Sequence, residues 1–363
     1  MSLTLATHAF STIAFVRIDA LLSGAWAIVL LVAAGAILST GGQPVSALEP
    51  ELDTLLAREL HFSSSEFADL KRGKIVAHTL PPAAPEEVGV AGAVRVHGSH
   101  ARLIAAYRDI VAFRKSAAVL EIGRFSDPPD ASDLDALTTN RDDFDLRDCK
   151  VATCDIRLPA SEIQRIAASV DWRRPDAHAQ ASSLFKQLLL AHVTSYLTGA
   201  RGRFTQYDDG RTPVLPQVAG DDLIRTSPYL DRLQPGLSAH LTCLWSNPLD
   251  GAEDFLYWSK EQFGLAPFIS VTHVTIVQPG PHQSIATSRD VYSSRYIDGS
   301  LSLMIASDVV GDPQSFDLVY VNRSRASALR GPIAGLRRSI IEHKARRRLD
   351  SNLRDISARI ETF

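Results

Sequence analysis

The stretch Ser288–Ile305, with the sequence SRDVYSSRYIDGSLSLMI, alternates so persistently that it predicts a β-strand or a hairpin. In its second half, the alternation puts four aliphatic side chains on one face: Ile297, Leu301, Leu303 and Ile305. The opposite face is polar: Tyr296, Asp298, Ser300 and Ser302. We prefer the interpretation in which the polar row meets water and the aliphatic row packs on the terminal helix, since antiparallel sheets often have one wet face. The alternative is that the polar row borders a ligand site.

The same two-residue period continues on both sides of this stretch. Segments 237–245, 254–264, 268–278 and 316–327 are also strand-like and are separated by turns such as NPLDG, PGPH and GDPQ. Strands joined by short turns form an antiparallel meander. The chain closes with a long amphipathic helix over 333–361.

Upstream, the pattern predicts a helix near 51–60, strands over 73–80 and 88–98, a helix over 99–115 and a strand over 118–127. The segment from about 130 to 234 differs because it is helical by period, and its longest helix, over 177–201, has a wide apolar stripe. We expect one α+β domain over 48–363 with this helical insertion.

The first 47 residues predict a targeting segment. Ala20–Leu38 is a run of 19 residues without a charge, and Val45-Ser46-Ala47 has the spacing of a signal-peptidase site. Two alternatives remain: cleavage after Ala47, or a membrane anchor formed by residues 20–38. Both predict a protein exported to the periplasm or the extracellular space.

Composition limits the classes of function. The 363 residues are 45% apolar, so the chain can bury a large core, and its net charge of −3 does not indicate a nucleic-acid partner. With three cysteines, a disulfide framework does not hold the fold together. Cys149 and Cys154 can form a bridge only if a turn brings them together, so either a bridge or two half-buried thiols fits the sequence.

The order of these elements is similar to that of the helix-grip fold. In particular, residues 90–127, VAGAVRVHGSHARLIAAYRDIVAFRKSAAVLEIGRFSD, resemble the first strand, helix and second strand of the START-like (SRPBCC) superfamily. The resemblance covers Lys74–Asp127 and Glu253–Glu361. It implies a curved antiparallel sheet around the terminal helix, with a lipid or another apolar molecule held between them. No residue role is carried over, because the superfamily has no fixed motif to match.

Candidate ligand-binding residues follow from this arrangement. The expected set is polar and lies at the mouth of an otherwise apolar cavity: His273, Tyr292, Tyr296, Asp298 and Tyr320. A lone histidine such as His273 is more often a hydrogen-bonded core residue than a base. The sequence has no G-x-S-x-G, glycine-rich phosphate loop, H-E-x-x-H or paired C-x-x-C, so no catalytic residue, metal site or cofactor is predicted.

Charge is concentrated at the C-terminus. Arg330–Glu361 has nine Lys or Arg residues and four Asp or Glu residues, which gives this segment +5 and the rest of the chain −8. Five arginines of this segment are candidates for docking on a membrane surface or an acidic partner: Arg337, Arg338, Arg346, Arg347 and Arg348. The alternative is an ordinary solvated face of a helix that packs on the sheet.

The sequence therefore predicts an exported START-like protein that binds an apolar or amphipathic ligand, such as a lipid or isoprenoid. Two alternatives from other classes remain. One is a small-molecule enzyme using the same cavity, with His273 and Asp298 as its acid–base pair. The other is an envelope interaction protein without a ligand.

Overall fold

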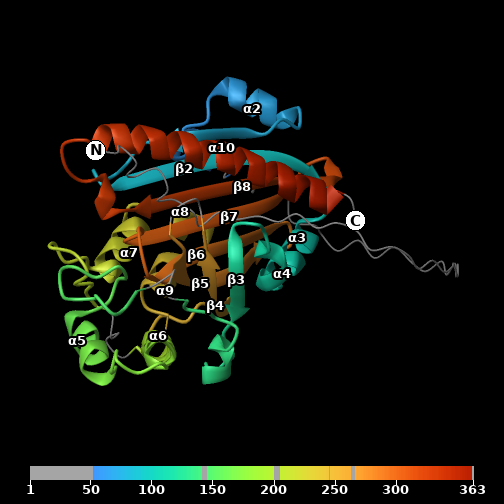
Figure 1. Ribbon diagram of the computed structural model, residues 1–363. Coiled ribbons are helices and arrows are strands. Elements are labelled where there is room, and N and C mark those ends of the chain that lie inside the picture. The colour runs from blue at the N-terminus through green and yellow to red at the C-terminus, as the bar shows by residue number, and fades with distance from the viewer. Residues whose placement is uncertain (1–51, 141–144, 200–204, 245, 263–265, 362–363) are drawn as a thin grey trace, which may run out of the picture.

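A computed structural model describes residues 52–363 except 141–144, 200–204, 245, 263–265 and 362–363 (Figure 1). The predicted targeting segment and its cleavage site lie outside these residues. No helix in the described part of the chain is long and apolar enough to cross a membrane.

The central element is one antiparallel sheet of eight strands in the order β1-β2-β8-β7-β6-β5-β4-β3. The strands are β1 (Val76–Leu80), β2 (Glu87–His97), β3 (Val119–Arg124), β4 (Glu253–Glu261), β5 (Phe268–Gly280), β6 (Gln283–Ser293), β7 (Gly299–Val309) and β8 (Asp312–Arg325). Strands β4 to β8 follow one another in both sequence and space, which confirms the predicted meander. The sheet and its C-terminal helix confirm the α+β class.

Helices cover both faces of the sheet (Figure 1). One face lies under α10 (Ala334–Glu361), α3 (His100–Arg108) and α4 (Ile110–Arg114). The other carries α7 (Pro216–Arg225), α8 (Tyr229–Leu233), α9 (Leu237–Thr242) and, toward β4, α5 (Ala160–Ser169) and α6 (Ala177–Thr198). The remaining helices are η2 (Leu55–Glu59), α2 (Ser64–Lys71), η3 (Ala131–Leu134) and η4 (Ser327–Leu329).

The terminal helix α10 packs closely along β1 and β2 (Figure 1). Its inward side chains are buried apolar residues: Ile341, Ala345, Leu349, Leu353, Ile356 and Ile360. Gly92 of β2 allows this approach, since a Cβ there would lie 2.8 Å from the Val76 carbonyl oxygen and 2.9 Å from Leu353 Cδ1. The arrangement is compatible with a helix-grip fold.

The preferred interpretation of the alternating stretch was wrong. Ser300 and Ser302 are only 1% and 4% exposed and lie on the α10 side of the sheet, where both accept hydrogen bonds from Asn322 Nδ2. The aliphatic row, including Leu301 and Leu303, packs on the opposite face, in the cluster that includes α7 to α9. The polar row is dry because helices cover both faces, so it binds protein groups instead of water.

Two local predictions also differ from the structure. Segment 237–245 was expected to be a strand, but Leu237–Thr242 forms helix α9, in which Leu237, His240 and Leu241 are buried with helical spacing. The helix expected over 99–115 is divided into α3 and α4 at Asp109, whose side chain accepts a hydrogen bond from Ala112 N. A carboxylate that caps a new helix in this way interrupts the preceding one.

The structure resolves the question of the two neighbouring cysteines. Cys149 and Cys154 form a disulfide, with their Cα atoms 4.2 Å apart. Backbone hydrogen bonds between Lys150 and Thr153 close the turn that brings them together. Cys243 is a free thiol.

Candidate functional site

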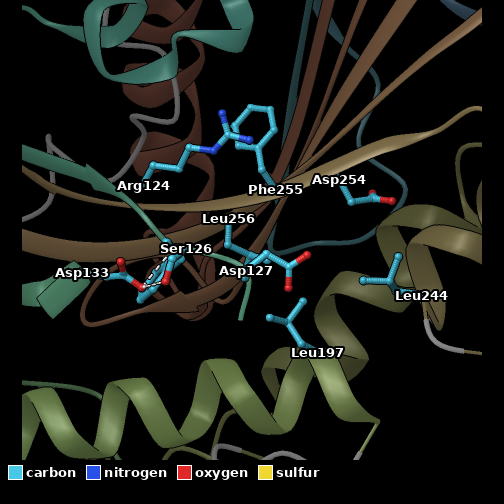
Figure 2. A pocket seen from close by; sticks show the side chains of 10 residues that line it. Arg124, Ser126, Asp127, Asp133, Leu197, Leu244, Asp254, Phe255 and Leu256 are labelled. Carbon is cyan, nitrogen blue, oxygen red and sulfur yellow. Dashed lines mark hydrogen bonds between the residues drawn. The ribbon is translucent and has the colours of Figure 1, made fainter. Parts of the chain in front are cut away.

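A pocket of about 570 Å³ lies at the edge of the sheet, where β3 ends and β4 begins (Figure 2). The end of α6 and the segment after α9 complete its walls. Its lining residues are Arg124, Phe125, Ser126, Asp127, Asp133, Leu197, Leu244, Asp254, Phe255 and Leu256. Five of the ten are apolar and three are aspartates, so the pocket combines an apolar surface with hydrogen-bond acceptors.

The position of Asp254 follows from strand alternation. In β4, Asp254, Leu256 and Trp258 project to the face that carries α6 and α9, whereas Phe255 and Tyr257 project to the α10 side. The register pairs Asp254 with Thr275 and Leu256 with His273 on β5. The carboxylate of Asp254 therefore lies on the same face as two polar side chains of the neighbouring strand.

Three side chains hold the Asp254 carboxylate. His273 Nε2 lies 2.9 Å from Oδ1, and Thr275 Oγ1 donates to the same oxygen at 2.7 Å. His240 Nε2, from α9, lies 3.1 Å from both carboxylate oxygens. The other ring nitrogen of His240 lies 2.8 Å from the carbonyl oxygen of Asn247. Both ring nitrogens of His240 are therefore engaged by oxygen atoms, which fixes the orientation of the ring.

These contacts determine the ionisation of Asp254. Burial alone would raise its pKa, but hydrogen bonds and charge interaction with His273, together with hydrogen bonds from Thr275 and His240, lower the pKa to about 2. Its side chain is still 23% exposed, so the carboxylate remains accessible from the pocket. At neutral pH, Asp254 is therefore a fixed anion that can accept a hydrogen bond from a bound molecule.

A hydrogen-bonded chain extends from Asp254 into α6. His273 Nδ1 lies 3.0 Å from the hydroxyl of Tyr196, one residue before the pocket-lining Leu197. Burial raises the pKa of Tyr196 to about 12, so its phenol keeps its proton at neutral pH and shares a hydrogen bond with Nδ1. Nε2–H of the same ring then donates to Asp254. The ring of His273 is fully buried, and both of its nitrogens already have partners.

The opposite wall of the pocket carries a cation over an aromatic ring. The guanidinium carbon of Arg124 lies 4.2 Å from the centre of the Phe255 ring, and Arg124 also donates to the carbonyl oxygen of Arg108 (Figure 2). The Asp133 carboxylate already accepts hydrogen bonds from Ser126 and from the backbone N–H of Asp130, so it stabilises the local loop. Asp127 is exposed at the pocket wall.

The five predicted binding residues do not meet in one place. His273 belongs to the Asp254 network, whereas Tyr292 lies on the same sheet face but is buried and donates to the carbonyl oxygen of Arg157. Asp298 pairs with Arg157 at 2.6 Å and accepts a hydrogen bond from Ser327. The remaining two residues lie elsewhere. Tyr296 is half-buried in the turn after β6, and Tyr320 lies on the α10 side of the sheet.

The five docking arginines also divide into two groups. Arg337 and Arg338 donate to the backbone carbonyls of Ala328 and Pro85 and are half-buried, as is Arg348. The other two, Arg346 and Arg347, are exposed on α10. Arg346 and Arg347 form no ion pair with any residue whose position is described.

Sequence reasoning missed Asp254, His240 and Tyr196. Asp254 precedes an apolar run and has the same parity as Leu256, which was a usable signal. His240 was missed because its segment was predicted to be a strand. Tyr196 was missed because it was counted in the apolar stripe of its helix. No group of three or more His, Cys, Asp or Glu side chains among residues with a described position is arranged to hold a metal ion.

Comparison with known proteins adds no family. No protein-family model matches the chain, and a search of curated proteins found no match.

Proposed function

We propose that this protein binds a small amphipathic molecule, of the lipid or isoprenoid class, in the pocket beside Asp254. The observation that carries the proposal is an ionised carboxylate, held by side chains from two other elements, at the wall of a half-apolar pocket. Its volume of about 570 Å³ is within the range of roughly 300–1,000 Å³ typical of ligand sites. This arrangement suits binding with a defined orientation.

The contacts indicate how such a ligand would lie. Its apolar part would cover Leu256, Leu197 and Leu244, and each methylene removed from water contributes roughly 0.8 kcal/mol. Its hydroxyl or amine would donate a hydrogen bond to Asp254. In this proposal the ligand lies at the edge of the sheet. It does not lie beneath α10, because buried apolar side chains fill much of that space.

A second candidate is an acid–base enzyme acting on the same ligand. The Tyr196–His273–Asp254 chain favours it, because it links a proton donor to a carboxylate through an imidazole. The carboxylate partner of His273 is then Asp254, since Asp298 is engaged by Arg157. Binding is the better-supported function, because His273 is buried with both nitrogens engaged.

The fold and a covalent feature support two further parts of the proposal. We infer kinship with the START-like superfamily from the arrangement of the sheet and α10. We also infer export, because the Cys149–Cys154 disulfide suits an oxidising compartment and residues 20–38 have the composition of a targeting segment. Recovery of the protein from host cytosol with both thiols free would contradict export.

Native mass spectrometry of the protein purified from its host's envelope tests the binding function. We expect a stoichiometric bound lipid or isoprenoid that is lost in Leu244→Trp, whose indole would fill the pocket. Asp254→Asn should weaken uptake of a fluorescent fatty alcohol about tenfold, the value of one hydrogen bond to a charged group. Asp250→Asn, at an exposed position outside the pocket lining, is the matched control. An empty protein that takes up no fluorescent fatty acid, alcohol or amine would refute binding.

A further inference from the structure

The terminal helix α10 has a buried face and a solvent face with different chemistry. Its inward residues pack on the sheet, as described above. Leu336, His343, Arg347 and Arg354 are all exposed, and their spacings of seven, four and seven residues put them on one side of the helix. The outward face is therefore a continuous stripe along α10, which lies across the outside of the molecule (Figure 1).

The first half of this stripe combines cations with protruding aliphatic side chains. Leu336 is 65% exposed and Ile333, just before the helix, is 52% exposed. Lys344, Arg346 and Arg347 are also exposed. Neither Arg346 nor Arg347 forms an ion pair with any residue the structure describes. We call these five residues, Ile333, Leu336, Lys344, Arg346 and Arg347, the basic-aliphatic patch.

Acidic side chains are rare around this patch. Between Gly331 and Arg347 the only acidic residue is Glu342, which is half-buried beside Arg338. The second half of α10 differs, because Arg354 pairs with Asp350 at 2.6 Å, and Asp355 and Glu361 are exposed. Arg346 and Arg347, which form no ion pair with a described residue, therefore lie in the half of α10 that has fewer acidic residues.

We propose that the basic-aliphatic patch docks on an anionic lipid bilayer. Exposed cations are attracted to acidic headgroups, and protruding aliphatic side chains enter the boundary between headgroups and acyl chains. Two aliphatic side chains standing separately among cations suit insertion into lipid better than a flat protein interface, whose centre is apolar and depleted of charge. This surface is separate from the pocket, so the inference stands independently of the proposed ligand.

The test uses the full chain in phosphatidylcholine vesicles with or without phosphatidylglycerol. The readout is local, so that any binding through residues 20–38 does not contribute: acetylation of Lys344, read by mass spectrometry against the exposed Lys150. We expect Lys344 to be protected only when phosphatidylglycerol is present, and high salt to remove the protection. Equal labelling of Lys344 in both vesicles would overturn the proposal.

Matched variants assign the effect to the patch. Each cation near an anionic surface strengthens attraction by roughly fivefold, so Arg346→Gln with Arg347→Gln should weaken protection about 25-fold. Leu336→Ser with Ile333→Ser should weaken protection without changing its dependence on salt. The control pair is Arg173→Gln with Arg211→Gln, at exposed positions outside α10. Protection that requires envelope proteins, and not phosphatidylglycerol, would instead identify an acidic protein partner and refute lipid docking.

Discussion

Two carboxyl groups on the same sheet have pKa values shifted in opposite directions. One lies in the layer between the sheet and α10, and the other lies at the pocket. Asp290 of β6 faces the α10 side, where burial and the nearby charge of Glu261 raise its pKa to about 7. Asp254 of β4 faces the pocket, and its histidine partners lower its pKa to about 2. Near neutral pH, the Asp290 carboxyl is therefore partly protonated, whereas the Asp254 carboxylate is ionised.

The difference arises from partners and not from depth alone. On the α10 side, the guanidinium of Arg114 pairs with the Glu261 carboxylate at 2.7 Å. Asp290 accepts one longer hydrogen bond, from the Thr272 hydroxyl at 3.3 Å. Beside the pocket, Asp254 accepts hydrogen bonds from three side chains. At Asp290, desolvation and the charge of Glu261 outweigh the opposing effects of Arg114 and the Thr272 hydrogen bond, whereas the imidazole contacts keep Asp254 ionised. We therefore expect Asp290 to affect the free energy of unfolding more than Asp254 does. Asp254 is the carboxylate that a ligand in the pocket can reach.

The largest expected effect concerns Asp290. Because its folded pKa is raised above the unfolded value of 3.8, its contribution to stability is fully present below pH 3.8 and is lost as pH rises through about 7. Asp290→Asn should remove this loss, so at pH 8 the variant should be more stable by at most about 4 kcal/mol. Urea unfolding at pH 4 and pH 8 measures the difference. A variant that is destabilised equally at both pH values would show that Asp290 is ionised in the folded protein.

The next test compares packing in the two regions. Leu353 of α10 is fully buried against the sheet, so Leu353→Ala should cost about 3 kcal/mol through lost burial and the cavity left behind. Leu244, half-buried at the pocket wall, has open space on one side, and Leu244→Ala should cost less than about 1 kcal/mol. Chemical denaturation of both variants gives the two values. Similar costs would mean that the pocket wall is packed as tightly as the layer under α10.

The third test concerns the ionised carboxylate of Asp254. Its folded pKa is below the unfolded value, so its stabilising contribution is present above pH 3.8 and is lost as pH falls through about 2. Partial exposure to solvent reduces this contribution, and Asp254→Asn should cost about 1–2 kcal/mol at pH 7 and little near pH 2. Unfolding curves of wild type and variant should converge on acidification. A difference that persists at pH 2 would assign the effect to packing and not to charge.

The strands of the meander and the terminal helix were predictable because their side-chain periods are local properties of the chain. The pocket was not, because its residues come from β3, β4, the end of α6 and the segment after α9, which are distant in sequence. His273 was identified as a candidate, but its partners Asp254, Tyr196 and His240 depend on strand register and on where the inserted helices lie. These long-range contacts leave no periodic signal in the sequence.

The sequence alone determined which residues of β7 lie on the same face, since the alternation of side chains is fixed by the geometry of a strand. It did not determine what covers each face. Tertiary structure decided that the aliphatic row of β7 packs on the side of α7 to α9 and that Ser300 and Ser302 are buried toward α10. The physical reason is that a side chain's environment is set by segments far along the chain, whereas its direction is set by its own backbone.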